Sequence, residues 1–176
     1  MALKFGFVLL PHFTLTAFST FVDTLRLAGD EGDFSRPVDC SWTFLASNPD
    51  GVTSSCGAHI RREAPLKNPQ QFDYIVICGG LLHRGDVLSD ELKTFLHEAA
   101  SANITLIGLC TGALILARAG LMTGRRCCIS WFHYQELEAE QTGVIPVADQ
   151  LFVVDGNRIT CSGGVASADL AAWIIE

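Results

Sequence analysis

The sequence has few basic residues, no paired-cysteine motif and no unbroken apolar stretch long enough to cross a membrane. Lys and Arg number 12 against 19 Asp and Glu, which gives a formal net charge of −7 over 176 residues. The basic residues are also scattered along the chain rather than clustered. Such a surface repels phosphate backbones, so the chain is a poor candidate for binding nucleic acid by itself.

The cysteines follow no pattern that indicates a disulfide framework or a zinc site. There are seven, an odd number without a C-x-x-C pair, and several lie in apolar runs where cysteine acts as a small hydrophobic residue. Cys127 and Cys128 lie near His133, but their spacing matches no zinc motif. We therefore expect free thiols in a reducing compartment, with no metal and no other cofactor.

The apolar stretches are too short or too interrupted to indicate a membrane segment. The N-terminal run ends at Pro11 and His12, too early for a signal peptide. Residues 104–122 are more apolar, but Gly108 and Gly112 divide them into a strand-like half and a helix-like half. We therefore expect a cytoplasmic protein without a membrane partner.

Apolar runs of strand length alternate with helical patterns along the chain. The predicted strands are 5–10, 39–46, 74–78, 105–109, 151–154 and 158–161. The predicted helices are 18–28, 90–100, 111–119, 131–140 and 166–176. This alternation predicts a single α/β domain over 1–176, doubly wound, with a mostly parallel sheet and helices on both faces.

Cys110 lies between two glycines where a predicted strand meets a predicted helix. The segment GLCTG, 108–112, has the form G-x-nucleophile-x-G with cysteine in the position of serine. Glycine allows the backbone to make a sharp turn, and the start of a helix favours a thiolate. A buried cysteine with closely packed glycines is the alternative. The position between strand and helix favours a nucleophile elbow at the ligand-binding edge of the sheet.

Several segments together resemble one protein family. LIGLCTGALILARAGLMTGRR resembles the elbow segment of the ThiJ/PfpI, class I glutamine amidotransferase-like superfamily. FGFVLLPHFTLTAFSTFVDTLRLAG, YIVICGG and DGNRITCSGGVASADLA are similar to segments of one branch, the sensor half of AraC-family transcriptional regulators. The resemblance covers nearly the whole chain. It implies a flavodoxin-like fold, a homodimer and the sensing of a small-molecule effector.

The residues that would activate Cys110 in hydrolytic relatives are replaced in this chain. By resemblance, Ser130 stands in place of their histidine and Ala17 in place of their glutamate, and neither can accept a proton at neutral pH. His133 lies three residues further along, and His12 and His83 are outside candidates. The resemblance therefore implies a degenerate site in which Cys110 is a vestigial nucleophile.

The same comparison indicates which residues bind the effector. Backbone N–H groups of Gly79, Gly80 and Thr111 are expected to form a nest for an anion beside Cys110. Regulators of the resembled branch respond to amino-acid-like or quaternary-amine metabolites such as arginine, carnitine or betaines. An effector of that class is implied by the resemblance alone.

Side chains around this edge are further candidates for the ligand site. Ser130 and the aromatic residues Phe13 and Trp131 are three of them. The two aromatic rings could contact a cationic group of the ligand by cation–π interaction, or they could be ordinary core residues. Arg84, with His83, could clamp a carboxylate, or both could lie in a solvated loop.

Three functions remain open on this sequence. The first is an effector-sensing domain, the second a cysteine-dependent amidase, hydrolase or hydratase, and the third a redox-sensing or purely dimerising module. The missing proton acceptors favour the first. Because the sequence stops inside an apolar helical stripe, 170–176, we also expect a C-terminal helix-turn-helix domain beyond it, through which alone DNA is bound.

Overall fold

A six-stranded sheet forms the central layer of the computed structural model, which describes residues 2–85 and 87–176. The strand order is β2-β1-β5-β6-β10-β9. The strands are β1 (Leu3–Leu9), β2 (Cys40–Leu45), β5 (Tyr74–Cys78), β6 (Thr105–Leu109), β9 (Phe152–Asp155) and β10 (Arg158–Cys161). Neighbouring strands are parallel except for the β9–β10 pair. The C-terminal ends of five strands therefore meet at one edge of the sheet.

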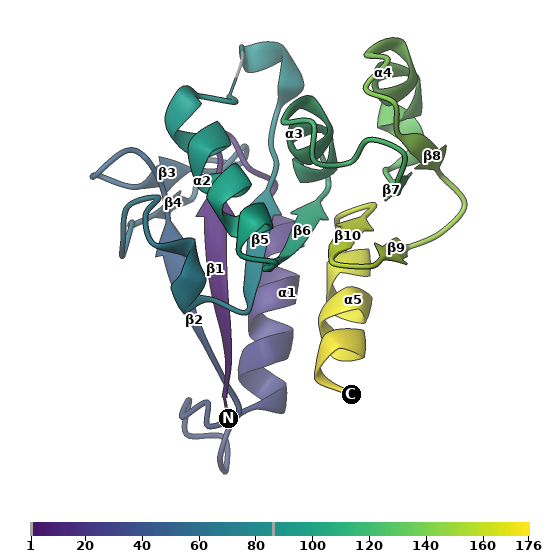
Figure 1. Ribbon diagram of the computed structural model, residues 1–176. Helices are drawn as coiled ribbons and strands as arrows, with labels where there is room; N and C mark the ends of the chain where they lie inside the picture. The colour runs from purple at the N-terminus through teal and green to yellow at the C-terminus, as the bar shows by residue number, and fades with distance from the viewer. Residues whose placement is uncertain (1, 86) are drawn as a thin grey trace.

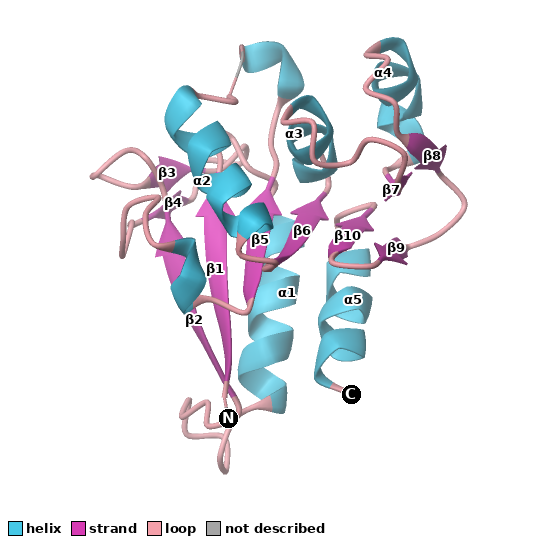
Figure 2. Ribbon diagram, in the orientation of Figure 1, coloured by secondary structure: helices cyan, strands magenta, loops and turns pink. Residues whose placement is uncertain are grey.

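Helices cover both faces of this sheet (Figures 1 and 2). Helices α1 (Leu15–Ala28) and α5 (Ala166–Ile175) lie on one face, and α2 (Asp90–Ser101) and α3 (Gly112–Arg118) lie on the other. Strand β5 is apolar throughout because Val76 packs toward α1 and α5 while Ile75 and Ile77 pack toward α2 and α3. The predicted doubly wound, flavodoxin-like α/β fold is confirmed.

Short elements complete the fold outside the main sheet. A hairpin of β3 (Val52–Thr53) and β4 (His59–Ile60) lies near the end of β1, and β7 (Arg126–Cys128) pairs with β8 (Ile145–Val147). The short 3-10 helices are η1 (Pro69–Gln71), η2 (Leu82–Arg84) and η3 (Trp131–His133). The helix predicted at 131–140 is divided into η3 and α4 (Tyr134–Ala139). The pattern does not predict β7 or β8, because three residues are too few to show an alternation.

The apolar segment 104–122 is divided as its glycines predict. Its first half is β6, and its second half contains α3, which is seven residues long. Among the residues that the structure describes, no helix is long and apolar enough to span a membrane.

Candidate functional site

Cys110 lies at the C-terminal edge of the sheet, in the turn between β6 and α3. Its φ is 54°, in the left-handed region that residues other than glycine rarely adopt. The Cys110 N–H donates to the carbonyl of Cys161 at 3.1 Å, and the Cys110 carbonyl accepts from Ala113 at 3.3 Å. The sharp strand-to-helix turn that GLCTG predicts is therefore present, and it leaves the thiol half-buried.

Two glycines make this turn possible by letting backbones approach closely. A Cβ atom on Gly112 would overlap the carbonyl oxygen of Ile77 in β5. A Cβ atom on Gly163, after β10, would lie 2.6 Å from the Cβ of Cys110. The turn is thus wedged between the ends of β5 and β10, and a side chain at either glycine would displace it.

The groups described near the Cys110 thiol are a hydroxyl and two other thiols. The Thr14 hydroxyl donates to Cys110 Sγ over a long 3.9 Å. Burial raises the pKa of Cys161 to about 11 and that of Cys78 well above its ordinary value, so both remain protonated thiols. Neither neighbouring cysteine can therefore serve as a base for Cys110.

Neither of the two positions where hydrolytic relatives have a catalytic base, Ala17 and Ser130, provides a proton acceptor for Cys110. Ala17 is buried in α1, and the Ser130 carbonyl accepts the His133 N–H at the start of η3. His133 itself is paired with Glu136. Within 2–85 and 87–176, no histidine or carboxylate is hydrogen-bonded to the Cys110 thiol.

The predicted anion nest is smaller than expected. The Gly79 N–H donates to the Leu109 carbonyl at 3.3 Å, so that part of the prediction is wrong. The cause is the close contact between the ends of β5 and β6, which satisfies this donor inside the sheet. In the described part of the chain, no acceptor takes the N–H of Gly80 or Thr111, and the Thr111 hydroxyl donates to the Gly80 carbonyl at 2.7 Å.

The two candidate aromatic residues do not lie together at this turn. Phe13 is fully buried and packs edge-on against Phe18, with ring centroids 5.6 Å apart. It is therefore a core residue, the alternative considered for it above. Trp131 is 79% exposed and lines a separate hollow of about 570 Å³ with Phe132 and Tyr134. The described contacts link neither Ser130 nor Trp131 to Cys110, so their predicted place beside the thiol is not supported by a contact.

Arg84 lies in a different place from the one predicted for it. It lines a cavity of about 530 Å³ at the ends of β1 and β2, together with His12 and His59. Neither Cys110 nor the exposed His83 is a lining residue of this cavity. Sequence reasoning missed the cavity because its walls come from segments that are far apart in the chain.

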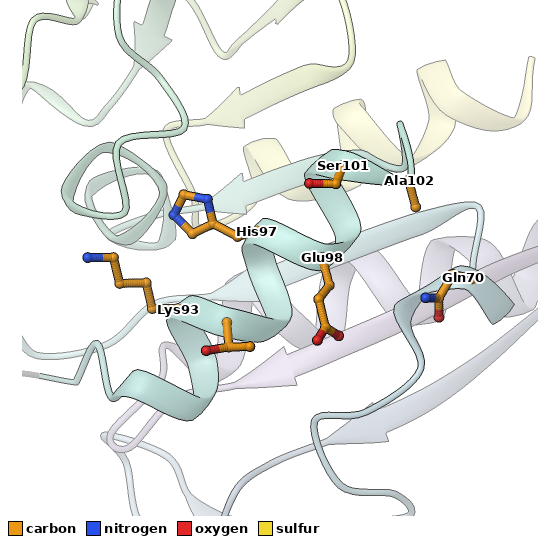
Figure 3. Close-up of a pocket in the computed structure, with 7 residues that line it drawn as sticks. Gln70, Lys93, His97, Glu98, Ser101 and Ala102 are labelled. Atoms are coloured by element: carbon orange, nitrogen blue, oxygen red, sulfur yellow. The ribbon is translucent and has the colours of Figure 1, made fainter.

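A larger hollow of about 700 Å³ lies on the outer surface of α2. It is lined by Lys93, His97, Glu98 and Ser101 of α2 and by Gln70 of η1. Figure 3 draws the side chains that line it. These side chains are exposed and carry charges of both signs. None of the residues predicted for the ligand site lines it. The described residues also contain no cluster of three or more His, Cys, Asp or Glu that could hold a metal ion.

Known proteins that resemble this chain include both regulators and an enzyme. The HTH-type transcriptional regulator GbdR of Pseudomonas aeruginosa is 32% identical over 170 residues, which cover 97% of this chain and 45% of the regulator. The isonitrile hydratase of Pseudomonas putida is 30% identical over 177 residues, covering 100% of this chain and 72% of the enzyme. This chain therefore spans about half the length of that regulator.

Solved structures agree with these sequence similarities. The crystal structure of an AraC family transcriptional regulator from Pseudomonas putida matches with a TM-score of 0.84 and 25% identity, over 98% of this chain and 90% of that one. A family model described as the DJ-1/PfpI family matches residues 11–176. With this match over nearly its whole length, the chain belongs to the DJ-1/PfpI family.

Proposed function

We propose that this chain is the effector-sensing domain of an AraC-type transcriptional regulator and not an enzyme. The observation that carries the proposal is a thiol in a sharp turn without a proton acceptor among its described hydrogen-bond partners. An adjacent proton acceptor is a common way in which a catalytic cysteine is activated for turnover. The similarity to GbdR over 97% of the chain supports a regulatory role for a site of this kind.

The proposed effector is a small amino-acid-like or quaternary-amine metabolite bound beside Cys110. The N–H groups of Gly80 and Thr111, which no described acceptor takes, support the binding of a carboxylate there. In this proposal the half-buried thiol packs against the ligand without attacking it. The cationic end of the effector is implied only by the resemblance to regulators.

The proposal extends to the whole protein in which such a domain works. DNA is bound through a helix-turn-helix domain outside these residues, the protein is cytoplasmic, and two copies associate. Exposed apolar side chains support self-association: Trp131, Phe132 and Val165 are 79%, 69% and 74% exposed. Sedimentation tests this part, and a monomer at concentrations of tens of micromolar would contradict it.

Thermal unfolding with matched ligands tests the sensing function. Betaine and choline share a quaternary amine, but only betaine has a carboxylate, and arginine and carnitine extend the series. We expect at least one of the three carboxylate-containing compounds to raise the Tm. At a ligand concentration of about 100 times Kd, the free energy of unfolding should increase by about 2.7 kcal/mol. Choline should have no effect. If no compound of the series raises the Tm, or if choline does so equally, the proposed effector class is wrong.

A cysteine-dependent hydratase or hydrolase is the second candidate function. The 30% identity to an isonitrile hydratase over 100% of the chain and the strained φ of 54° at Cys110 favour it. Isonitrile, amide and ester substrates should be converted no faster by the wild type than by Cys110→Ala. A rate that depends on Cys110 would establish the enzyme and remove the first proposal.

A further inference from the structure

The cavity that contains Arg84 lies at the ends of β1 and β2 and is separate from the turn at Cys110. Its lining residues come from four parts of the chain: 8–12 at the end of β1; 46–48 and 51–53, with His59, after β2; Leu66; and Arg84, Val87, Ser89 and Leu92 around the start of α2. Its volume of about 530 Å³ is in the range of small-molecule sites. The C-terminal ends of parallel strands are also where ligands of such folds bind.

The interior of this cavity is apolar. Leu10, Val52, Leu66 and Leu92 line it, and each is at most 7% exposed. Leu10, Leu66 and Leu92 belong to the core on the α2 side of the sheet, and Val52 to the core on the other side. A ligand that enters far enough to contact these side chains must therefore present a hydrocarbon part.

The polar lining of the cavity contains one arginine and no described acidic residue. Besides Arg84 it includes two histidines, His12 and His59, and neutral polar side chains. This composition is unusual in a chain with a net charge of −7. No described carboxylate pairs with the Arg84 guanidinium, whose planar donors match the two oxygens of a carboxylate.

Hydrogen bonds hold two walls of the cavity in place. His59 contacts the Asp50 carbonyl through Nε2 at 2.8 Å and the Thr53 hydroxyl through Nδ1 at 3.0 Å. The Arg62 guanidinium donates to the carbonyls of Ala46 and Ser47 at 3.1 and 3.0 Å.

The remaining wall is held by a helix cap. The Ser89 hydroxyl accepts from the Leu92 N–H at 3.2 Å, which places the start of α2 against the cavity. A preformed cavity loses little conformational entropy when it binds a ligand.

We propose that this cavity binds a small organic anion, a carboxylate with a short apolar chain, whose charged group pairs with Arg84. The apolar interior contacts the hydrocarbon chain, and the Arg84 guanidinium pairs with the carboxylate. This site is distinct from the proposed effector site beside Cys110, and the inference does not depend on the regulatory function.

Titration with valerate tests the proposal directly. Backbone amide chemical shifts of the isotope-labelled protein are followed as valerate, pentanamide or pentylammonium is added. We expect saturable shifts at Gly51 and Val52 with valerate, and much weaker binding of the neutral and cationic analogues. Arg84→Gln should weaken valerate binding about five- to tenfold, the loss of one charge-assisted contact.

Two matched variants establish whether valerate binds in this cavity or elsewhere on the protein. Arg36→Gln also removes an exposed arginine, but Arg36 lies over Phe34 and does not line the cavity. Cys110→Ser alters the other site. Both should bind valerate like the wild type. The proposal is overturned if valerate does not saturate, if Arg36→Gln weakens binding as much as Arg84→Gln, or if the shifts centre on 108–112 and vanish in Cys110→Ser. Unchanged melting of Arg84→Gln without ligand confirms that the variant is folded.

Discussion

At the scale of single residues, the two most accessible thiols differ in what surrounds them. Cys110 is half-buried in a turn with a φ of 54°, and only tight packing around it can maintain such a conformation. Cys56 is exposed in the loop between β3 and β4, with its sulfur 3.3 Å from the Ser54 hydroxyl. The other five cysteines are buried.

Cys56 is predicted to be the first cysteine to react with iodoacetamide. The hydrogen bond from Ser54 lowers the pKa of the Cys56 thiol, so more of it is thiolate at neutral pH. The rate of Cys56 labelling should rise with pH around a midpoint below that of an ordinary thiol, and Ser54→Ala should move that midpoint upward. Mass mapping after short labelling measures both.

The Cys110→Ala variant is the control for this assignment. In this variant Cys56 should still be labelled first, and the second label, which we expect on Cys110 in the wild type, should be absent. First labelling of a buried cysteine such as Cys127 would contradict this order of exposure.

At the scale of elements, helix α2 connects the core to the cavity of Arg84. Leu92, Phe95 and Leu96 bury its inner face against the sheet, while Ser89 caps its first turn beside the cavity. The sequence S-D-E at 89–91 predicts this cap, and the hydrogen bond from the Leu92 N–H confirms it. The helix start is therefore specified locally, although its position against β1 is not.

Ser89→Ala is predicted to lower the free energy of unfolding by about 1 kcal/mol. The Leu92 N–H loses its side-chain acceptor, and no other described group replaces it. Urea unfolding followed by circular dichroism measures the change. Ser101→Ala, at the exposed C-terminal end of the same helix, is the matched control and should change stability by less than about 0.5 kcal/mol. Equal effects of the two variants would show that the cap contributes nothing.

At the scale of the whole molecule, several of the twelve basic side chains form ion pairs or hydrogen bonds within the fold. Three arginines form ion pairs with acidic residues, Arg26 with Asp30, Arg118 with Glu140 and Arg125 with Asp155. Arg158 is buried and donates to the Leu121 carbonyl, and Arg62 donates to backbone carbonyls. The remaining basic residues are scattered along a chain with a net charge of −7, which disfavours contact with phosphates.

These residues are therefore predicted not to bind duplex DNA with any sequence preference. Fluorescence anisotropy with labelled promoter DNA at low salt is a demanding test, because phosphate attraction is strongest there. We expect weak binding, if any, that disappears as salt is added. Tight binding that distinguishes one sequence from another would show that DNA recognition lies in this domain.

The local sequence accounts for much of the fold and for the centre of the candidate site. Apolar runs such as 74–78 and 105–109 predict buried strands because a parallel sheet hides both of its faces. The glycines of GLCTG predict the turn at Cys110, since only glycine permits such close backbone contacts. Both are properties of a few consecutive residues, which a sequence displays directly.

Only the tertiary structure decided which of the candidate residues meet. It buried Phe13 in the core, left Trp131 in solvent, and gave the Gly79 N–H an acceptor in β6. It also brought the ends of β1 and β2 together with Arg84 around a cavity that no motif indicates. The periodicity of a sequence reports how each segment alternates between core and solvent. It does not report which distant segments pack together, because that depends on the order and register of strands across the whole sheet.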